Sequence, residues 1–494
     1  MALQNSIRTF SIKGKITRNV FRSMTTAPRV CIIGSGPAGF YTAQYVLKHH
    51  KKAEVDIFEK LPVPFGLVRY GVAPDHPEVK NASSTFEEVA ESRRCSFFGN
   101  VNVGHDIKAN ELRQFYDAVV FAYGADDDKR LNIPGEDANG VYAARSFVGW
   151  YNGLPAHADL APNLNCETAV IIGQGNVALD VARLLLSPTS LLKHTDICSH
   201  ALAKLETSRI KKVHIIGRRG PIEVSFTTKE LREMIRLDGT KLIFHREDFV
   251  DVRPKVSELP RQRKRLIELM CKTALDPVTP NEEARRGECT REWELNFLRT
   301  PHEILTDDDN NVCGIRLEKN RLVKNKDGVY TPEGTGKCEE FSCGMVLRSV
   351  GYKSIKVEEG IPFDVRLGVI PNFDGRVVDA PNSKKILKGL YCSGWVKHGP
   401  VGVIVTTMNE AFATGQRIVT DLNEGVLGYS KEKMSAADMQ ALMSKRGINY
   451  VTFEDYQNID NEEMLRGKEN KKPREKITSF NEMLKIAFRD KKPS

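Results

Sequence analysis

Two glycine-rich turns carry the residue types and spacing that hold the pyrophosphate of a dinucleotide. The first, Gly34-Ser35-Gly36-Pro37-Ala38-Gly39, follows the apolar run 30–33, and the second, Gly173-Gln174-Gly175-Asn176-Val177-Ala178, follows the apolar run 169–172. A glycine turn between a strand and a helix lets the backbone approach a pyrophosphate at the positive N-terminus of that helix. The sequence therefore predicts two strand–turn–helix units that each bind a dinucleotide.

The residues that follow each second strand differ in charge. Glu59 lies twenty residues beyond Gly39, whereas Arg218 and Arg219 follow the second strand of the other unit. An acid at this place accepts hydrogen bonds from a ribose diol, and arginines suit a 2′-phosphate. We therefore expect one dinucleotide with an unmodified ribose and one with a phosphorylated ribose. The interval from Ala178 to Arg218 is about twice the usual one, so residues 188–211 are interpreted as an insertion.

Composition excludes several other classes of protein. The chain has 494 residues, 40% hydrophobic and 28% charged, which is typical of a soluble α/β protein of several domains. No apolar stretch approaches the ~18–20 residues of a membrane span. The ten cysteines include no Cys-x-x-Cys pair, which argues against a zinc ribbon, a bound iron–sulfur cluster or a dithiol centre. We therefore expect no metal site.

The first 28 residues are basic, rich in Ser and Thr, and free of acids, although the net charge of the whole chain is only +9. This composition is typical of a mitochondrial transit peptide. A disordered basic arm that binds nucleic acid is the alternative interpretation. Further along, residues 226–236 predict a capped helix, the stretch from about 404 to 422 predicts a long one, and the charged stretch 466–476 predicts irregular structure.

Several longer motifs occur in the same order as in one known family. These are PFGLVRYGVAPDHPEVKN, GQGNVALDVAR, GRRGP, YCSGWVKHGPVGVI and, near the end, RGKENKKPREK. With both glycine turns, they make the chain resemble the adrenodoxin reductase family of mitochondrial, FAD-containing, NADPH-dependent ferredoxin reductases. The resemblance extends from about residue 28 to the C-terminus.

The resemblance implies an α/β fold of two doubly wound, Rossmann-like domains, with an NADP domain inserted into a discontinuous FAD domain. The implied boundaries are a transit peptide over 1–27, the FAD domain over 28–128 and 353–494, and the NADP domain over 129–352. The implied activity passes electrons from NADPH through FAD, one at a time, to an acidic [2Fe–2S] ferredoxin. That ferredoxin would serve cytochrome P450 hydroxylation, iron–sulfur cluster assembly, or both.

The resemblance also implies roles for single residues. The FAD site would contain Gly34, Gly36, Ala38, Gly39, Glu59, Leu67, Val103, Trp395, Gly402, Val403 and Ile404. The NADP site would contain Gln174, Gly175, Asn176, Val177, Arg218, Arg219, Glu230 and Gly402. Val103 is equally explained as a core valine, Trp395 as a packing residue, and Glu230 as an acid that stabilises a helix N-terminus.

His76 and Asp180 are the candidates for a catalytic role at the nicotinamide side of the flavin. Because the cofactors carry the hydride chemistry themselves, orientation is the larger task of the protein. Arg232, Arg261 and Arg265 resemble the basic surface on which the family docks its ferredoxin, and a solvated basic helix face is the alternative.

We expect a monomer in the mitochondrial matrix, with no nucleic-acid partner, and any association with the inner membrane is expected to be peripheral. A glutamate-synthase-type reductase subunit also has paired dinucleotide folds, but it usually carries cysteine clusters that are missing here. A basic nucleic-acid-binding module would leave both glycine turns unused.

Overall fold

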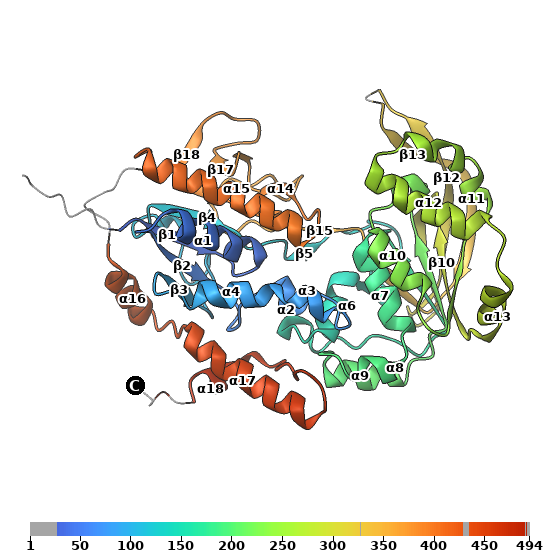
Figure 1. Cartoon of the computed structure of the whole chain (residues 1–494), viewed down its shortest axis with the longest axis horizontal. Helices are drawn as coiled ribbons and strands as arrows, with labels where there is room; N and C mark the ends of the chain where they lie inside the picture. The colour runs from blue at the N-terminus through green and yellow to red at the C-terminus, as the bar shows by residue number, and fades with distance from the viewer. Residues whose placement is uncertain (1–26, 327, 428–433, 490, 492–494) are drawn as a thin grey trace, which may run out of the picture.

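The computed structural model describes residues 27–326, 328–427, 434–489 and 491. The predicted transit peptide falls almost entirely on residues 1–26, outside the described residues. A mainly parallel sheet and a fully parallel sheet, each with helices packed against it, lie side by side, and the C-terminal helices lie along the first (Figure 1). Within the described part of the chain, no helix is both long and apolar enough to cross a bilayer.

The first sheet has seven strands in the order β16-β17-β18-β4-β1-β2-β3. Strands β3, β2, β1, β4 and β18 run parallel, and β16 and β17 complete one edge in antiparallel pairing. Their bounds are β1 Arg29–Ile33, β2 Glu54–Phe58, β3 Cys95–Phe98, β4 Ala118–Phe121, β16 Asn372–Phe373, β17 Arg376–Val378 and β18 Ile386–Cys392. This sheet therefore joins strands from both ends of the chain.

Both faces of this sheet are covered, which explains its nearly continuous apolar strands. Val30 and Ile32 pack toward helices α1 (Pro37–His49) and α15 (Ile404–Asn423). The alternate residues Cys31 and Ile33 pack in the core of the opposite face. The helix predicted from about residue 404 to 422 is confirmed by α15.

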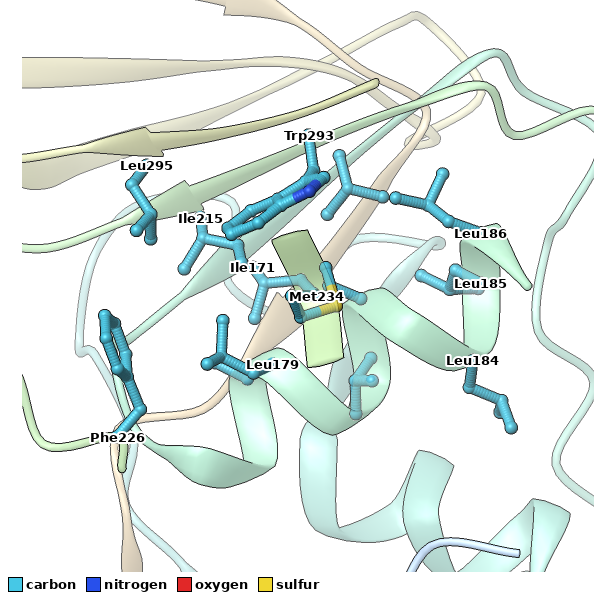
Figure 2. Close-up of a cluster of buried hydrophobic side chains, with 14 of the residues drawn as sticks. Ile171, Leu179, Leu184, Leu185, Leu186, Ile215, Phe226, Met234, Trp293 and Leu295 are labelled. Carbon is cyan, nitrogen blue, oxygen red and sulfur yellow. The ribbon is translucent and has the colours of Figure 1, made fainter. Parts of the chain in front are cut away.

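The second sheet has six parallel strands in the order β6-β14-β7-β8-β10-β9. Their bounds are β6 Val141–Ala143, β7 Thr168–Ile172, β8 Lys212–Ile216, β9 Thr240–Ile243, β10 Arg291–Asn296 and β14 Met345–Arg348. One face packs Ile171, Ile215 and Trp293 against α7 (Asn176–Leu186) and α10 (Thr228–Ile235), as Figure 2 shows. The predicted fold class, two doubly wound α/β units, is confirmed.

The other face of the second sheet is covered by an antiparallel sheet. Its strands are β11 Arg299–Thr306, β12 Val312–Lys324 and β13 Tyr330–Ser342. Val170 and Ile172 of β7 pack there with Ile315 and Leu317 of β12. The inserted segment after α7 forms α8 (Thr189–Leu192) and α9 (Ser199–Glu206), which accounts for the long interval before the arginine pair.

The remaining helices surround the two sheets. They are α2 Leu67–Tyr70, α3 Pro77–Lys80, α4 Ala82–Ala90, α5 Ala109–Leu112, α6 Ala144–Tyr151, α11 Glu247–Val250, α12 Arg261–Leu275, α13 Pro280–Glu288, α14 Trp395–His398, α16 Ala436–Lys445, α17 Phe453–Glu469 and α18 Phe480–Ala487. The chain passes from one sheet to the other through β5 (Asp127–Asp128) and back through β15 (Tyr352–Lys353). These two strands pair with each other in antiparallel register.

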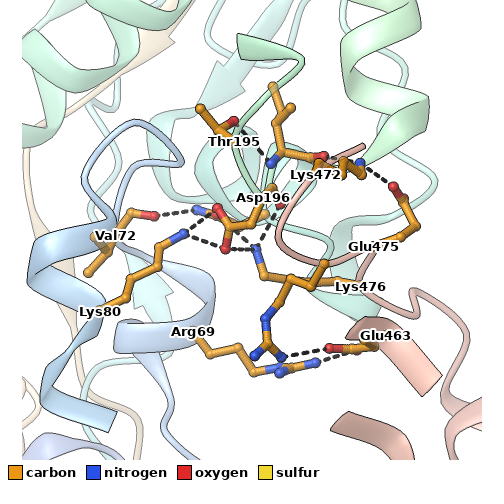
Figure 3. A network of polar contacts seen from close by, with 12 residues as sticks. Arg69, Val72, Lys80, Thr195, Asp196, Glu463, Lys472, Glu475 and Lys476 are labelled. Atoms are coloured by element: carbon orange, nitrogen blue, oxygen red, sulfur yellow. Dashed lines mark hydrogen bonds and ion pairs between the residues drawn. The ribbon is translucent and has the colours of Figure 1, made fainter. Parts of the chain in front are cut away.

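The charged segment after α17 connects the two halves of the molecule, the first half built on the seven-stranded sheet and the second half on the six-stranded sheet. Irregular structure was predicted from Arg466, but α17 continues to Glu469, so the prediction is wrong for its first turn. Lys476, only 3% exposed, donates to Asp196 Oδ2 at 2.9 Å, and Lys80 donates to both oxygens of Asp196 at 2.6 Å (Figure 3). Burial and Lys476 lower the pKa of Lys80 to about 8, while the two lysines hold the pKa of Asp196 well below its usual value despite burial.

Candidate functional site: two dinucleotide cradles

The first glycine turn lies where β1 meets α1. Gly34 has a φ of +108°, and a Cβ there would lie 2.6 Å from the carbonyl oxygen of Ala122. A Cβ on Gly36, the residue that precedes α1, would instead meet no protein atom within 4 Å. Packing therefore explains Gly34, whereas Gly36 leaves room above the helix N-terminus for an approaching phosphate.

Glu59 is 9% exposed and follows β2 beside this turn. Its Oε2 accepts hydrogen bonds from the Ser35 backbone N at 3.1 Å and from Ser35 Oγ at 2.7 Å. The carboxylate is thereby held next to the glycine turn.

The late block containing Trp395 comes against the same turn. A Cβ on Gly394 would lie 2.4 Å from the Cβ of Ala38, so the backbone before α14 touches the start of α1. Gly402 has a φ of +91°, and a Cβ there would lie 2.2 Å from Thr406 Oγ1. Backbone conformation and the Thr406 hydroxyl thus provide a reason for this glycine besides a ligand. Trp395 also packs on Tyr352, with ring centroids 5.7 Å apart.

Four further predicted FAD residues divide between surface and core. Val403 and Leu67 are 45% and 38% exposed, and Ile404 begins α15. Leu67 follows Gly66, at which a Cβ would lie 3.1 Å from the Cα of Gly36. Val103 is 6% exposed and belongs to the apolar cluster on the opposite face of the sheet. Its burial there is consistent with the alternative interpretation as a core valine.

The second glycine turn repeats the first at the end of β7. A Cβ on Gly173 (φ +126°) would lie 2.1 Å from the Ser349 carbonyl oxygen, and one on Gly175 would meet nothing within 4 Å. The side chain of Gln174 covers Gly217, and the Oδ1 of Asn176 accepts from the Thr227 backbone N at 2.8 Å. Asn176 begins α7 and Val177 follows it.

Arg218 and Arg219 follow β8 and are both exposed. Within the described residues, neither guanidinium forms an ion pair with a protein acid. Their backbone is fixed, because the Arg218 carbonyl accepts from Asn320 Nδ2 at 2.9 Å and the Arg219 carbonyl from the Leu298 N at 3.1 Å. The pair is thus available for a phosphate, for which guanidinium is a good hydrogen-bonding partner.

A buried arginine contacts Asp180 and Glu230 directly and reaches His76 through Glu233, which lies 3.7 Å from the arginine. Arg183 of α7 is 4% exposed and contacts Asp180 at 2.8 Å and Glu230 at 3.2 Å. It also forms a two-pronged pair with Asp75, at 2.6 and 3.1 Å. His76 Nε2 lies 2.8 Å from Glu233 Oε2.

Sequence reasoning missed Arg183, Asp75 and Glu233. Asp75 neighbours the predicted His76, and Arg183 and Glu233 lie one helical turn or less from the predicted Asp180 and Glu230. That spacing is the signal that could have found them.

The pKa values of the carboxylates in this cluster are shifted in opposite directions. Burial raises the pKa of Glu230 to about 7, with the nearby charge of Asp180 adding to the shift. Burial likewise raises the pKa of Asp180. Burial opposes the charge of Asp75, but its hydrogen bonds from Arg183 outweigh that and its pKa is lowered. His76, Glu230 and Glu233 each place a ligand atom within 4.8 Å of the others, yet Arg183 already supplies the positive charge there.

The three predicted docking arginines lie on neighbouring helices of the second half. Arg232 is exposed on α10, and Arg261 and Arg265 are exposed on the first turns of α12. Within the described residues, none of the three forms an ion pair. Helices α10 and α12 pack against each other, so the three charges belong to one side of this half.

Both cradles fit the dinucleotides that the sequence predicts, because each has an open glycine before a helix and the expected charged group beyond the second strand. A chain with two such dinucleotide sites, here called cradles, belongs to the class of oxidoreductases that bind both a pyridine nucleotide and a flavin dinucleotide. Consistently, a family model described as pyridine nucleotide-disulphide oxidoreductase matches residues 28–242. All ten cysteines are free.

Individual relatives are much more similar. The chain is 52% identical to the mitochondrial NADPH:adrenodoxin oxidoreductase of Homo sapiens, over 94% of this chain and 93% of that one. It is 45% identical to the protein of that name from Arabidopsis thaliana, over 94% and 97%. Among solved structures, Mycobacterium tuberculosis FprA in complex with NADPH is 38% identical with a TM-score of 0.85, over 93% of this chain and 100% of that one. The chain belongs to the NADPH:adrenodoxin oxidoreductase family.

Proposed function

We propose that this protein is an NADPH:ferredoxin oxidoreductase that uses FAD and delivers electrons singly to an acidic [2Fe–2S] ferredoxin of the adrenodoxin type. The observation that carries the proposal is the pair of cradles with opposite charge signals. Glu59 lies beside the first glycine turn, and the exposed Arg218 and Arg219, which form no ion pair within the described residues, follow the strand after the second turn. The names of the relatives from Homo sapiens and Arabidopsis thaliana, both mitochondrial NADPH:adrenodoxin oxidoreductases, support the same activity.

The residues would divide the task as follows. Glu59 would hold the ribose of FAD, and the N-terminus of α1 its pyrophosphate. Gln174 to Val177 would hold the pyrophosphate of NADPH, and Arg218 and Arg219 its 2′-phosphate. When bound, FAD supplies the conversion between a hydride, which carries two electrons, and the single electrons that an iron–sulfur cluster accepts.

The cluster around Arg183 would align the two halves at the nicotinamide side. Arg183 belongs to α7 of the second half, and its partner Asp75 belongs to the loop that follows the first cradle. We assign His76 and Asp180 to positioning the nicotinamide, since precise orientation of the reacting groups is what a hydride transfer needs from the protein. His76→Gln should then lower kcat for NADPH oxidation more than it raises KM, whereas an equal effect on both would contradict this role.

Arg232, Arg261 and Arg265 would form the docking surface for the ferredoxin. Complementary charge mainly accelerates association and is weakened by salt. Charge reversal at Arg261 and Arg265 should therefore lower ferredoxin-dependent cytochrome c reduction by about tenfold or more at low salt. Reduction of ferricyanide should stay unchanged, because it needs no docked protein.

The matched control is Lys272→Glu, an exposed residue at the opposite end of the same helix. It should leave both reactions near the wild-type rate. If reversal at Arg261 and Arg265 leaves ferredoxin-dependent reduction unchanged, this surface does not dock the partner.

We further propose an FAD domain over 28–128 and 353–494 and an NADP domain over 129–352. The membership of the two sheets supports these limits, because every strand from β6 to β14 lies outside the first sheet. The proposed location is the mitochondrial matrix, with at most peripheral contact with the inner membrane, and the proposed state is a monomer. Both steroid-type hydroxylation and iron–sulfur assembly are compatible destinations for the ferredoxin.

A further inference from the structure

A cavity of about 360 Å³ lies beside the two strands that connect the halves of the molecule. Figure 1 shows β5 and β15 between the two sheets. Lys129 and Arg130 follow β5, Lys353 belongs to β15, and Arg366 lies in the loop after it. The cavity is therefore built from both passages of the chain, and none of its lining residues belongs to a glycine turn.

The lining of this cavity is strongly cationic. Four of its eight lining residues are Lys129, Arg130, Lys353 and Arg366, and none is an acid. Two of these cations already have partners, since Lys353 pairs with Asp127 at 3.0 Å and Arg130 pairs with Asp137 and, at 3.6 Å, with Glu136. Within the described residues, Lys129 and Arg366 have no ion pair. Lys129 and Arg366 thus line the same hollow, and no acid is among the described residues that line it.

The walls of the cavity are held by hydrogen bonds of the backbone. The Asn132 N donates to the carboxylate of buried Glu136 at 2.7 Å, and Arg348 holds the same carboxylate at 2.7 Å. On the other wall, Gly368 (φ +67°) donates to the Asp364 carbonyl at 2.7 Å in a tight turn. This turn presents Val365 and Leu367, which are 81% and 55% exposed, beside the cations.

We propose that this cavity binds a phosphate group that carries an apolar substituent. The phosphate would lie between Lys129 and Arg366, where charge-assisted hydrogen bonds to its oxygens are favourable. The substituent would lie on Val365 and Leu367. Such a ligand ties together the two segments through which the chain passes between its halves, so it acts on their connection and not on either cradle.

Phosphate of this kind has two sources, a soluble phosphate and a lipid headgroup, and two probes distinguish them. The first is a soluble alkyl phosphate, hexyl phosphate, followed by titration calorimetry. The second is sedimentation with phosphatidylcholine vesicles that contain phosphatidic acid. Both use the full chain loaded with FAD and saturated with NADP⁺, which keeps the probes out of the second cradle. At least one probe should bind.

The deciding variant is the double substitution Lys129→Gln/Arg366→Gln. Loss of two charged hydrogen-bond partners should weaken binding by about tenfold or more, while the flavin spectrum and thermal midpoint stay unchanged because both residues are exposed. Lys193→Gln, an exposed lysine in the inserted segment, should bind like the wild type. Failure of both probes to bind, or equal binding by the double variant, would overturn the proposal.

Discussion

Replacing Arg218 and Arg219 by Gln should convert a preference for NADPH into near indifference between NADPH and NADH. Both guanidiniums are exposed, and within the described residues neither has an ion pair. A hydrogen bond to a charged group contributes ~1.5–3 kcal/mol, and exposure argues for the lower limit. Two such contacts give about 3 kcal/mol, which is roughly a 100-fold change at about 1.4 kcal/mol per tenfold.

The assay is steady-state ferricyanide reduction with each nicotinamide, because it needs no ferredoxin. kcat/KM for NADPH should fall roughly 100-fold through KM, while the value for NADH should change by less than about threefold. Lys211→Gln, an exposed lysine just before β8, is the control and should leave both values unchanged. Equal losses with NADPH and NADH would refute the assignment of the 2′-phosphate to these arginines.

Four further substitutions test other parts of the structure. Gly36→Ala should lower FAD retention without unfolding the chain, since a Cβ there meets no protein atom within 4 Å but occupies the space left for the pyrophosphate. Normal flavin content would contradict the proposed FAD site. Glu230→Gln should raise stability to urea more at pH 7.5 than at pH 5. Burial raises the pKa of Glu230 from 4.5 to about 7, so the native protein loses stability as pH rises through that interval, and the neutral Gln removes this loss. An equal gain at both pH values would contradict this. Asp196→Asn should lower the free energy of unfolding by about 3–5 kcal/mol, because Lys80 and Lys476 lose a shared buried partner. Lys476→Met should lower the free energy of unfolding by less. A larger loss for Lys476→Met than for Asp196→Asn would contradict this network.

The parts of the molecule that follow from local patterns were predictable. Each glycine turn lies between an apolar run and a helix start, and such a unit is determined within about thirty residues. The structure places both turns at strand ends with the expected open glycine. The pairing of β18 with β4 brings the late block with Trp395, which the resemblance places in the FAD site, to the sheet that carries the first glycine turn.

The parts that depend on distant partners were not predictable. In the sequence, Lys476 is one of many charged residues near the C-terminus. Its burial depends on its ion pair with Asp196, which lies in the inserted segment. Arg183 has the spacing of an ordinary helix residue, and its role follows from Asp75 in the other half. Strands β5 and β15 are two residues long each, too short to leave a periodic signal.

The most direct test is an anaerobic titration of the FAD-loaded protein, followed by its flavin absorbance. NADPH should bleach the flavin band with one equivalent per chain, and oxidised [2Fe–2S] ferredoxin should then restore it while two ferredoxins are reduced. A chain that stays colourless after incubation with FAD, or a flavin band that NADPH leaves unchanged, would contradict the account.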